Sequence, residues 1–146
     1  MPEGYVRAMN QGSERFLVAE PETGGGRLAS FCSFGGDRII GLYTHPHWAG
    51  RGVAGSLLAC AEVAILADGH ERIGITATLG GRAFYEKHGY RVFQARDSRT
   101  RGGLVVAVLE MEKSFPRGHS FRLAPDRRER AGWGLTTGHI TESSRA

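Results

Sequence analysis

Residues 45–58 read HPHWAGRGVAGSLL and place three glycines, Gly50, Gly52 and Gly55, at the start of a predicted helix. The helix is indicated by apolar residues that recur about every four positions and therefore share one face. They are Val53, Leu57, Ala61 and Ile65, with Ala54, Leu58 and Ala64 beside them. Gly69 predicts the end of this helix, because glycine readily adopts the left-handed conformation of a C-terminal cap.

Glycines that lead into a helix favour an anion site at its N-terminus. The first N–H groups of a helix lack partners and lie at the positive end of its dipole, so they attract a phosphate or pyrophosphate. Arg51 adds a positive charge. The glycines also match G-x-G-x-x-G, but a dinucleotide site needs a strand directly before the loop and an acidic residue about 20 positions later, and neither is present. A Walker loop is excluded because no Lys follows Gly55. A tight turn without a ligand is the remaining alternative.

The segments on both sides of this helix predict a mixed α/β (α+β) fold. The predicted strands cover 16–19, 27–34, 38–44, 73–77, 90–95 and 104–111, and a short second helix covers 81–88. The first three strands are joined by glycine turns and form a meander. Residues 96–103 predict a basic loop, and the first fourteen residues show no periodic pattern. This order predicts a mixed sheet flanked by helices.

Length and composition indicate one soluble globular domain. The chain has 146 residues, of which 40% are hydrophobic and 23% charged, and a chain of this size folds without disulfides or metals. No apolar run approaches the roughly 20 residues that cross a bilayer, and no secretory signal is visible. Cys32 and Cys60 lie in apolar runs, where cysteine is usually reduced and buried. These features predict a cytoplasmic protein without a membrane partner.

The net charge of +4 is concentrated near the C-terminus. Residues 114–146 carry six arginines against three acidic residues, so +1 remains for the rest of the chain. A nearly neutral globular part argues against nucleic-acid binding by that part. A solvated basic tail is the simplest interpretation, and a nucleic-acid-associated protein that acts through this tail is an alternative.

Two motifs resemble those of the GNAT superfamily of N-acetyltransferases. Residues 45–58 are similar to its acetyl-CoA-binding motif, usually written Q/R-x-x-G-x-G/A, and residues 83–90, AFYEKHGY, are similar to its second motif. The motifs stand in the family's order, with a helix and a strand between them. The resemblance divides the chain into a lead of residues 1–15, an acyl-CoA-binding domain of 16–113 and a basic tail of 114–146.

The resemblance implies an N-acetyltransferase that moves an acetyl group from acetyl-CoA to a primary amine by direct attack. It implies a sheet that splays open between the strands at 38–44 and 73–77, with the pantetheine arm in the gap. Amides of residues 50–55 bind the pyrophosphate, and Tyr85 matches the tyrosine that faces the CoA sulfur in many members. The acetyl-CoA-binding residues implied in this way are Leu42, Tyr43, Thr44, Gly50, Arg51, Gly52, Val53, Ala54, Gly55, Ser56, Gly80, Phe84, Tyr85 and Lys87.

The implied reaction needs three kinds of group. Strand N–H groups stabilise the tetrahedral oxyanion, and the phenol of Tyr85 can donate a proton to the leaving thiolate. A base must take the proton of the amine, and Asp37, Glu20, His45 or a water chain are the candidates left open. A metal is not expected, because the pair His45-x-His47 has no further ligand cluster beside it.

The sequence departs from the family's pattern at three places. Ala49 replaces the usual Gln or Arg, and Gly80 replaces an asparagine that contacts the pantetheine arm. The family usually opens with a strand and two helices, which residues 1–15 are too short to form. A shortened gene product, a second subunit in a homodimer, or a C-terminal strip with Phe121, Trp133 and Leu135 would each account for this. The alternative function is a catalytically weak or inactive GNAT-like module that binds CoA or a partner.

Overall fold

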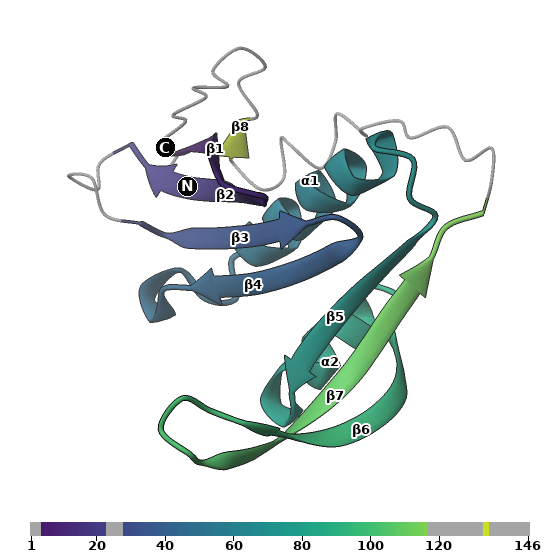
Figure 1. The fold of residues 1–146 in the computed structure, drawn as a ribbon. Helices are drawn as coiled ribbons and strands as arrows, with labels where there is room; N and C mark the ends of the chain where they lie inside the picture. The colour runs from purple at the N-terminus through teal and green to yellow at the C-terminus, as the bar shows by residue number, and fades with distance from the viewer. Residues whose placement is uncertain (1–3, 23–27, 117–132, 135–146) are drawn as a thin grey trace.

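The protein is described here by a computed structural model that covers residues 4–22, 28–116 and 133–134 (Figure 1). In these residues it forms one sheet of eight strands with two α-helices. The strands are β1 (Gly4–Gln11), β2 (Glu14–Pro21), β3 (Ser30–Gly35), β4 (Arg38–Thr44), β5 (Arg72–Thr78), β6 (Arg91–Arg99), β7 (Val105–Ser114) and β8 (Trp133–Gly134). The helices are α1 (Val53–Ala67) and α2 (Arg82–Lys87), each preceded by a short 3-10 turn, η1 (Pro46–Trp48) and η2 (Leu79–Gly81).

The sheet is mixed, as the sequence predicts. Its strand order is β6-β7-β5-β4-β3-β2-β1-β8. The pairs β4–β5 and β1–β8 are parallel, and the other neighbours are antiparallel. The predicted meander is confirmed, because β2, β3 and β4 follow one another as antiparallel neighbours.

The pairing of β4 with β5 is short. It consists of two residue pairs, Arg38 with Gly74 and Ile39 with Ile75. Beyond these pairs the strands diverge (Figure 1). The sheet thus has a first arm, β1–β4, and a second arm, β5–β7, which meet at a closed end and separate at an open end. The predicted splay is confirmed.

Both helices lie on the same side of the sheet, behind it in Figure 1. The predicted apolar face of α1 is buried against the sheet, and its buried residues are Val53, Leu57, Leu58, Ala61 and Ile65. Isoleucines of β5 and Met111 of β7 complete this core. We call the opposite side of the sheet the open face, since no helix of the described residues covers it. None of the described helices has the length and apolar character needed to cross a membrane.

The expectation that the N-terminal strand is missing is wrong. Residues 4–11 form β1, which pairs with β2 along its whole length through a two-residue turn. Gly12 has a φ of 61°, as the first central position of a type II′ hairpin turn requires. Its sequence, GYVRAMNQ, has no regular apolar spacing, and the strand forms through pairing with β2. Between β1 and β2 there is no helix, so the two strands join directly.

The predicted loop at 96–103 is also partly wrong, because β6 continues to Arg99. Its polar residues pair with the apolar start of β7, Ser98 facing Val106 and Arg99 facing Val105. The chain reverses in a tight turn in which Thr100 donates its amide to the carbonyl of Leu104 at 2.8 Å. Cross-strand pairing therefore overrides the turn propensity of this segment.

Part of the predicted tail belongs to the fold. Phe115 packs against the core, and its amide donates to the carbonyl of Glu71 at 2.8 Å. Trp133 and Gly134 pair with the start of β1. Phe121 and Leu135 lie outside the described residues.

Candidate active site

The loop that enters α1 presents free backbone amides. Gly50 and Gly52 have φ values of 75° and 81°, a left-handed conformation that strains other residues. Gly52 is the N-cap of α1, and no side chain caps this end. The first-turn amides of α1, among them those of Val53 and Ala54, therefore have no side-chain acceptor, and amides at such a helix N-terminus are of the kind that binds phosphate.

Two side chains of the predicted site brace this loop. The Ser56 hydroxyl donates to the carbonyl of Gly52 at 3.0 Å, and the Ser56 amide donates to the same oxygen at 3.1 Å. The Arg51 guanidinium lies 5.1 Å from the centre of the Trp48 ring. These contacts fix the shape of the loop, which leaves its backbone as the main donor to an anion.

Gly55 has a steric role that the sequence analysis missed. A Cβ atom at this position would lie 3.0 Å from Cε1 and 3.3 Å from Nε2 of His88. His88 follows α2 and stacks on Phe84 with a centroid distance of 4.6 Å. The third glycine of the loop thus lets the end of α2 approach the first turn of α1. This contact brings the two motifs together.

A register shift changes the direction of the backbone groups at the end of β4. Phe34 faces Ile39 whereas Ser33 faces Gly41, so Ile40 is an extra residue in β4. Such a bulge reverses the direction in which the following backbone groups point.

Beyond the bulge, the backbone of β4 points alternately toward β3 and toward the gap. The carbonyl of Tyr43 accepts a hydrogen bond from Ser30 Oγ at 2.6 Å, and the amide of His45 donates to Ala29 at 2.8 Å. Hydrogen-bonded positions alternate along antiparallel strands. Leu42 and Thr44 therefore direct their backbone groups toward the gap. Of the three predicted residues, Tyr43 is the one whose backbone is used by β3.

Tyr85 is partly buried on α2 against the core. Its ring packs between Phe84 and Tyr90, with centroid distances of 5.2 and 5.9 Å, and its carbonyl accepts the Tyr90 amide at 3.0 Å. Burial, with a smaller contribution from Cys32, raises the pKa of Tyr85 to about 12. The phenol is therefore neutral at physiological pH and available as a proton or hydrogen-bond donor.

The remaining predicted residues lie around η2 and α2. Gly80 is exposed in η2, and a Cβ atom there would meet nothing within 4 Å. Phe84 packs against the core, and Lys87 is exposed at the end of α2. The predicted site thus falls into three groups, at the end of β4, at the entry to α1 and along η2–α2.

The three candidate bases lie apart from one another. Glu20 forms an ion pair with Arg7 on the first arm. Asp37 lies at the closed end, where its carbonyl accepts the Gly74 amide at 3.0 Å. His45 follows β4 directly at the open end, and its Nδ1 accepts the His47 amide at 3.1 Å. Position therefore favours His45.

Nucleophilic chemistry at Cys32 finds little support. Cys32 is fully buried, and burial raises the pKa of its thiol to about 12, so it supplies no thiolate nucleophile. Within the part of the chain that the structure describes, no group of three or more His, Cys, Asp and Glu side chains could hold a metal ion.

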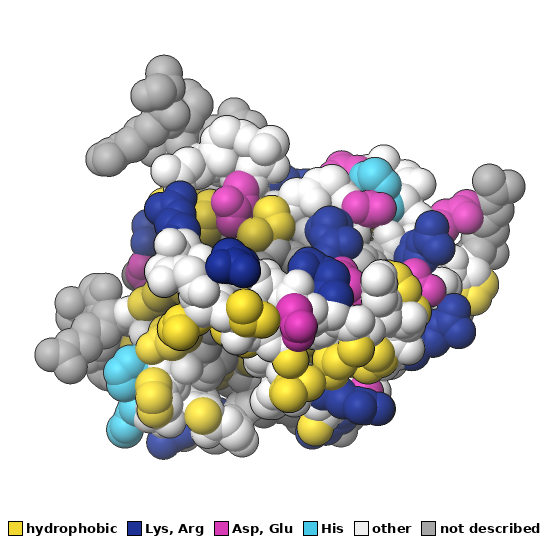
Figure 2. Space-filling view, turned by 60° about the horizontal axis from the view of Figure 1, so that its bottom comes forward, with side chains coloured by type: hydrophobic (Ala, Val, Ile, Leu, Met, Phe, Trp, Pro, Cys, Tyr) yellow, Lys and Arg dark blue, Asp and Glu magenta, His cyan; other side chains and the backbone are white. Residues whose placement is uncertain are grey.

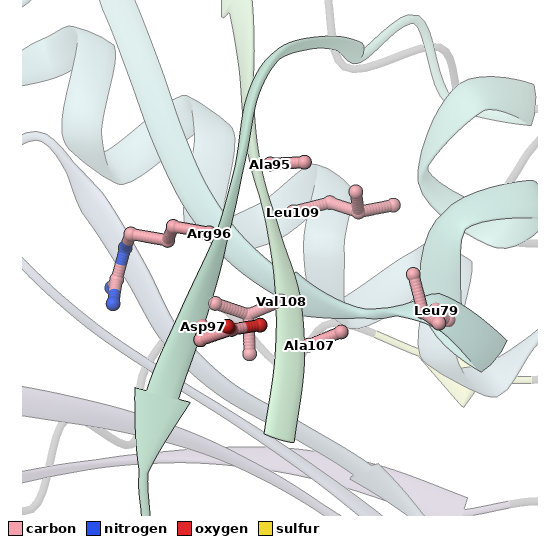
Figure 3. Close-up of a pocket in the computed structure, with 7 residues that line it drawn as sticks. All are labelled: Leu79, Ala95, Arg96, Asp97, Ala107, Val108 and Leu109. Carbon is pink, nitrogen blue, oxygen red and sulfur yellow. The ribbon is translucent and has the colours of Figure 1, made fainter. Parts of the chain in front are cut away.

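A shallow pocket of about 250 Å³ lies beside η2 on the second arm (Figure 3). It is lined by Leu79, Ala95, Arg96, Asp97, Ala107, Val108 and Leu109. The side chain of Arg96 extends to the other side of β6 from those of Ala95 and Leu109 (Figure 3). The apolar part of the pocket, formed by Leu79, Ala95 and Leu109, is therefore on the helix side, and Arg96 belongs to the open face.

A splayed mixed sheet with an uncapped glycine loop at the gap defines an acyltransferase fold of the GNAT type. Residues 12–92, more than half of the chain, match the sequence profile of the acetyltransferase (GNAT) domain family. The chain belongs to the GNAT acetyltransferase family. No curated protein matches it by sequence.

Solved structures show the same fold. A GCN5-related N-acetyltransferase from Rhodopseudomonas palustris, also titled a class-II aminotransferase, is 30% identical with a TM-score of 0.64, and the match covers 70% of this chain and 62% of that one. Nourseothricin acetyltransferase is 19% identical with a TM-score of 0.62 and coverages of 72% and 67%. PaiA N-acetyltransferase from Thermoplasma acidophilum, solved with coenzyme A, is 22% identical with a TM-score of 0.54 and coverages of 70% and 62%. The chain thus spans less than two thirds of the Rhodopseudomonas and Thermoplasma proteins.

Proposed function

We propose that this enzyme transfers an acetyl group from acetyl-CoA to a primary amine by direct attack. The observation that carries the proposal is the uncapped N-terminus of α1, which adjoins the open end of the β4–β5 pair. A pyrophosphate bound at this loop directs a pantetheine arm into the gap between the arms. The proposal needs both the uncapped loop and the gap beside it, because a phosphate-binding loop alone binds many anions.

Each part of the cofactor has a matching surface. Backbone amides of Gly50–Gly55 bind the pyrophosphate, and the gap-facing backbone groups of Leu42 and Thr44 hold the pantetheine arm and the thioester. Gly80, Phe84 and Lys87 flank the other side of the arm. Ala49 supplies no side-chain contact, so binding depends on the backbone.

The reaction follows from these positions. The amine nitrogen attacks the thioester carbon, and N–H groups of β4 stabilise the oxyanion by about 2.7–4 kcal/mol per donor, as in comparable sites. When the C–S bond breaks, Tyr85 donates its proton to the thiolate of CoA. His45 or a water chain takes the proton of the amine. The products are an N-acetylated amine and free CoA.

The experiment compares two glycines at opposite ends of α1. Gly52 and Gly69 have φ values of 81° and 97°, and a Cβ atom would meet nothing within 4 Å at either position. Gly52→Ala and Gly69→Ala should therefore cost similar stability, about 1–2 kcal/mol. In isothermal titration, we expect Gly52→Ala to weaken acetyl-CoA binding about tenfold and Gly69→Ala to leave it unchanged. Equal affinities for the two variants would contradict the proposed phosphate loop.

The alternative function is a module that binds CoA without turnover. Ala49 and Gly80 favour it, since neither offers the side-chain contact that the family's pattern has there. Release of the CoA thiol, measured with a panel of amines, separates the two functions. An enzyme releases thiol only with an amine present, whereas a binding module shows heat in the titration and no thiol.

A further inference from the structure

The open face of the second arm carries a carboxylate held by two arginines. Glu110 of β7 is 8% exposed. Its Oε1 accepts hydrogen bonds from Thr76 Oγ1 at 2.7 Å and from Arg96 Nε at 3.1 Å, and its Oε2 accepts one from Arg38 Nη2 at 3.2 Å. These residues come from four strands, and they face away from the helices because their neighbours Ile75, Leu109 and Met111 belong to the helix-side core.

The two arginines are held in fixed positions. Arg38 lies against the backbone of Gly74, where a Cβ atom would be 2.8 Å from Nη1, and its Nη2 also donates to Thr76 at 2.9 Å. Burial by itself raises the pKa of Glu110, but hydrogen bonds from Thr76, Arg96 and Arg38 outweigh it and hold that pKa below its usual value. Glu110 is therefore ionised and anchors both guanidinium groups.

The single negative charge of Glu110 balances only one of the two positive charges of Arg38 and Arg96. The side chains of Arg38 and Arg96 are 46% and 44% exposed. Each guanidinium has five N–H donors, and the contacts with Glu110 and Thr76 use only part of them. The remaining donors are ordered before any ligand binds, which lowers the entropic cost of binding an anion.

This cluster lies where the two arms separate. Thr76 directly follows Ile75, the last residue of β5 that pairs with β4. Across the gap, the open face of the first arm carries the rings of Phe31 and Tyr43, 5.7 Å apart, and Tyr43 is 45% exposed. Because α1 and α2 cover the helix side, a second substrate reaches the gap from the open face. It then meets the aromatic rings at the open end of β4 and the two arginines at Glu110, Arg96 from β6 and Arg38 from the start of β4.

We propose that the acceptor is an amine that also carries a carboxylate, and that Arg38 and Arg96 bind this anion. The inference rests on the proposed function, because it assigns the second substrate of the same site. Bidentate guanidinium–carboxylate contacts would orient the acceptor so that its amine points into the gap. An apolar or aromatic group beside the amine would contact Tyr43 and Phe31.

The same face offers a matched control. Arg91 Nη2 lies 3.2 Å from Glu112, a second partly buried carboxylate of β7. Glu112 faces Gly74 at the closed end, whereas Glu110 faces Thr76 at the separation of the arms. Arg91→Gln therefore removes the same charge from the same face but away from the gap.

The experiment uses the full chain and two pairs of compounds that differ by one carboxylate. Phenylalanine and 2-phenylethylamine serve as acceptors in thiol-release assays. N-acetylphenylalanine and N-acetyl-2-phenylethylamine are titrated calorimetrically into the CoA-saturated protein at constant ionic strength. We expect the unsubstituted enzyme to favour the carboxylate compound of each pair about tenfold. Arg96→Gln should abolish this preference, and Arg91→Gln should retain it.

The outcomes separate the two proposals. If the unsubstituted enzyme uses the compounds without a carboxylate equally well or better, the acceptor assignment is overturned and the proposed acetyl transfer stands. The same conclusion follows if the preference for the carboxylate compounds survives in Arg96→Gln. If Arg91→Gln also loses the preference for the carboxylate compounds, the acceptor assignment is overturned, because general charge attraction then explains the preference. If the protein fails to bind acetyl-CoA, the proposed function is wrong. Titration of the two acetylated compounds into the unliganded protein then still decides whether Arg96 binds a carboxylate.

Discussion

The first and second arms of the sheet contribute differently to the molecule. The first arm and α1 supply most of the large, fully buried side chains, among them Leu57, Leu58 and Ile65, whereas the second arm adds Ile73, Ile75 and Met111. Beside the gap, the first arm carries aromatic rings on its open face, whereas the second arm carries Glu110 and Arg96, which Arg38 of β4 joins from the first arm. Figure 2 shows the underside of the molecule, where hydrophobic and charged side chains both reach the surface.

This difference between the arms assigns stability mainly to α1 and the core around it, and substrate selectivity to the open face of the second arm. The long helix α1, which packs against the first arm, both fills the core and begins at the proposed phosphate loop, so the position of this loop is fixed by packing. The second arm holds its open face together with ion pairs and hydrogen bonds, which are directional and suited to recognising a substrate. We therefore expect substitutions in the core around α1 to change folding and substitutions on the open face of the second arm to change kinetics.

The largest expected effect comes from a pair of leucines. Leu57 of α1 is fully buried, whereas Leu79 of η2 is 61% exposed. Leu57→Ala should lower the free energy of unfolding by about 2–5 kcal/mol, because it removes buried methyl groups and leaves a cavity. Leu79→Ala should change it by less than about 0.5 kcal/mol. Urea denaturation followed by circular dichroism measures both values, and similar losses would refute the conclusion that packing of α1 fixes the fold while η2 adds little to stability.

Much of the fold was predictable because its strongest signals are local. The four-residue spacing from Val53 to Ile65 and the alternation from Ile73 to Ala77 each reflect burial on one face, and both elements formed as predicted. The strand β1 has no such signal, since it gains its structure from pairing with β2 and β8. Non-local pairing of this kind leaves little trace in composition.

The parts of the site that depend on local backbone conformation could be predicted from the sequence. The parts that depend on contacts between separate helices and strands could not. Gly50 and Gly52 indicated a turn with unpaired amides at the start of a helix, and both have positive φ. The contact of His88 with Gly55 and the bulge at Ile40 depend on the registers of separate elements. Glu110 likewise stands in an apolar run and meets its arginines only in the folded sheet.

A smaller effect is expected from Tyr85→Phe, which removes a hydroxyl from α2 and keeps the ring that packs on Phe84 and Tyr90. Thiol release should slow about 100-fold, because the leaving thiolate loses its proton donor. Acetyl-CoA affinity and the free energy of unfolding should stay nearly constant.

Tyr90→Phe is the matched control for this prediction. The Tyr90 hydroxyl donates to Glu62 Oε2 at 2.9 Å, beside Lys113, so its loss should lower stability by about 1 kcal/mol without slowing thiol release. Stopped assays with a thiol reagent and parallel denaturation curves measure both variants. Tyr85 is a packing residue if its substitution lowers stability and leaves the rate unchanged.

The smallest expected effect is a gain of affinity in Gly80→Asn. A side chain at this position enters open space beside η2, and the family's pattern places an asparagine there. One hydrogen bond to the pantetheine arm contributes about 0.5–1.5 kcal/mol, so acetyl-CoA should bind roughly three- to tenfold more tightly. Gly80→Ala restricts the backbone similarly but adds no amide, and it should leave the affinity unchanged.

The comparison of Gly80→Asn with Gly80→Ala also tests how strictly the arms divide their roles. Tighter binding by the asparagine variant alone means that the second arm can contact the cofactor as well as the acceptor, so that selectivity and cofactor affinity can be changed at one helix. Unchanged affinity in both titrations means that the pantetheine arm runs along β4, away from η2. The first arm would then hold the whole cofactor, and the second arm would act on the acceptor and the leaving sulfur.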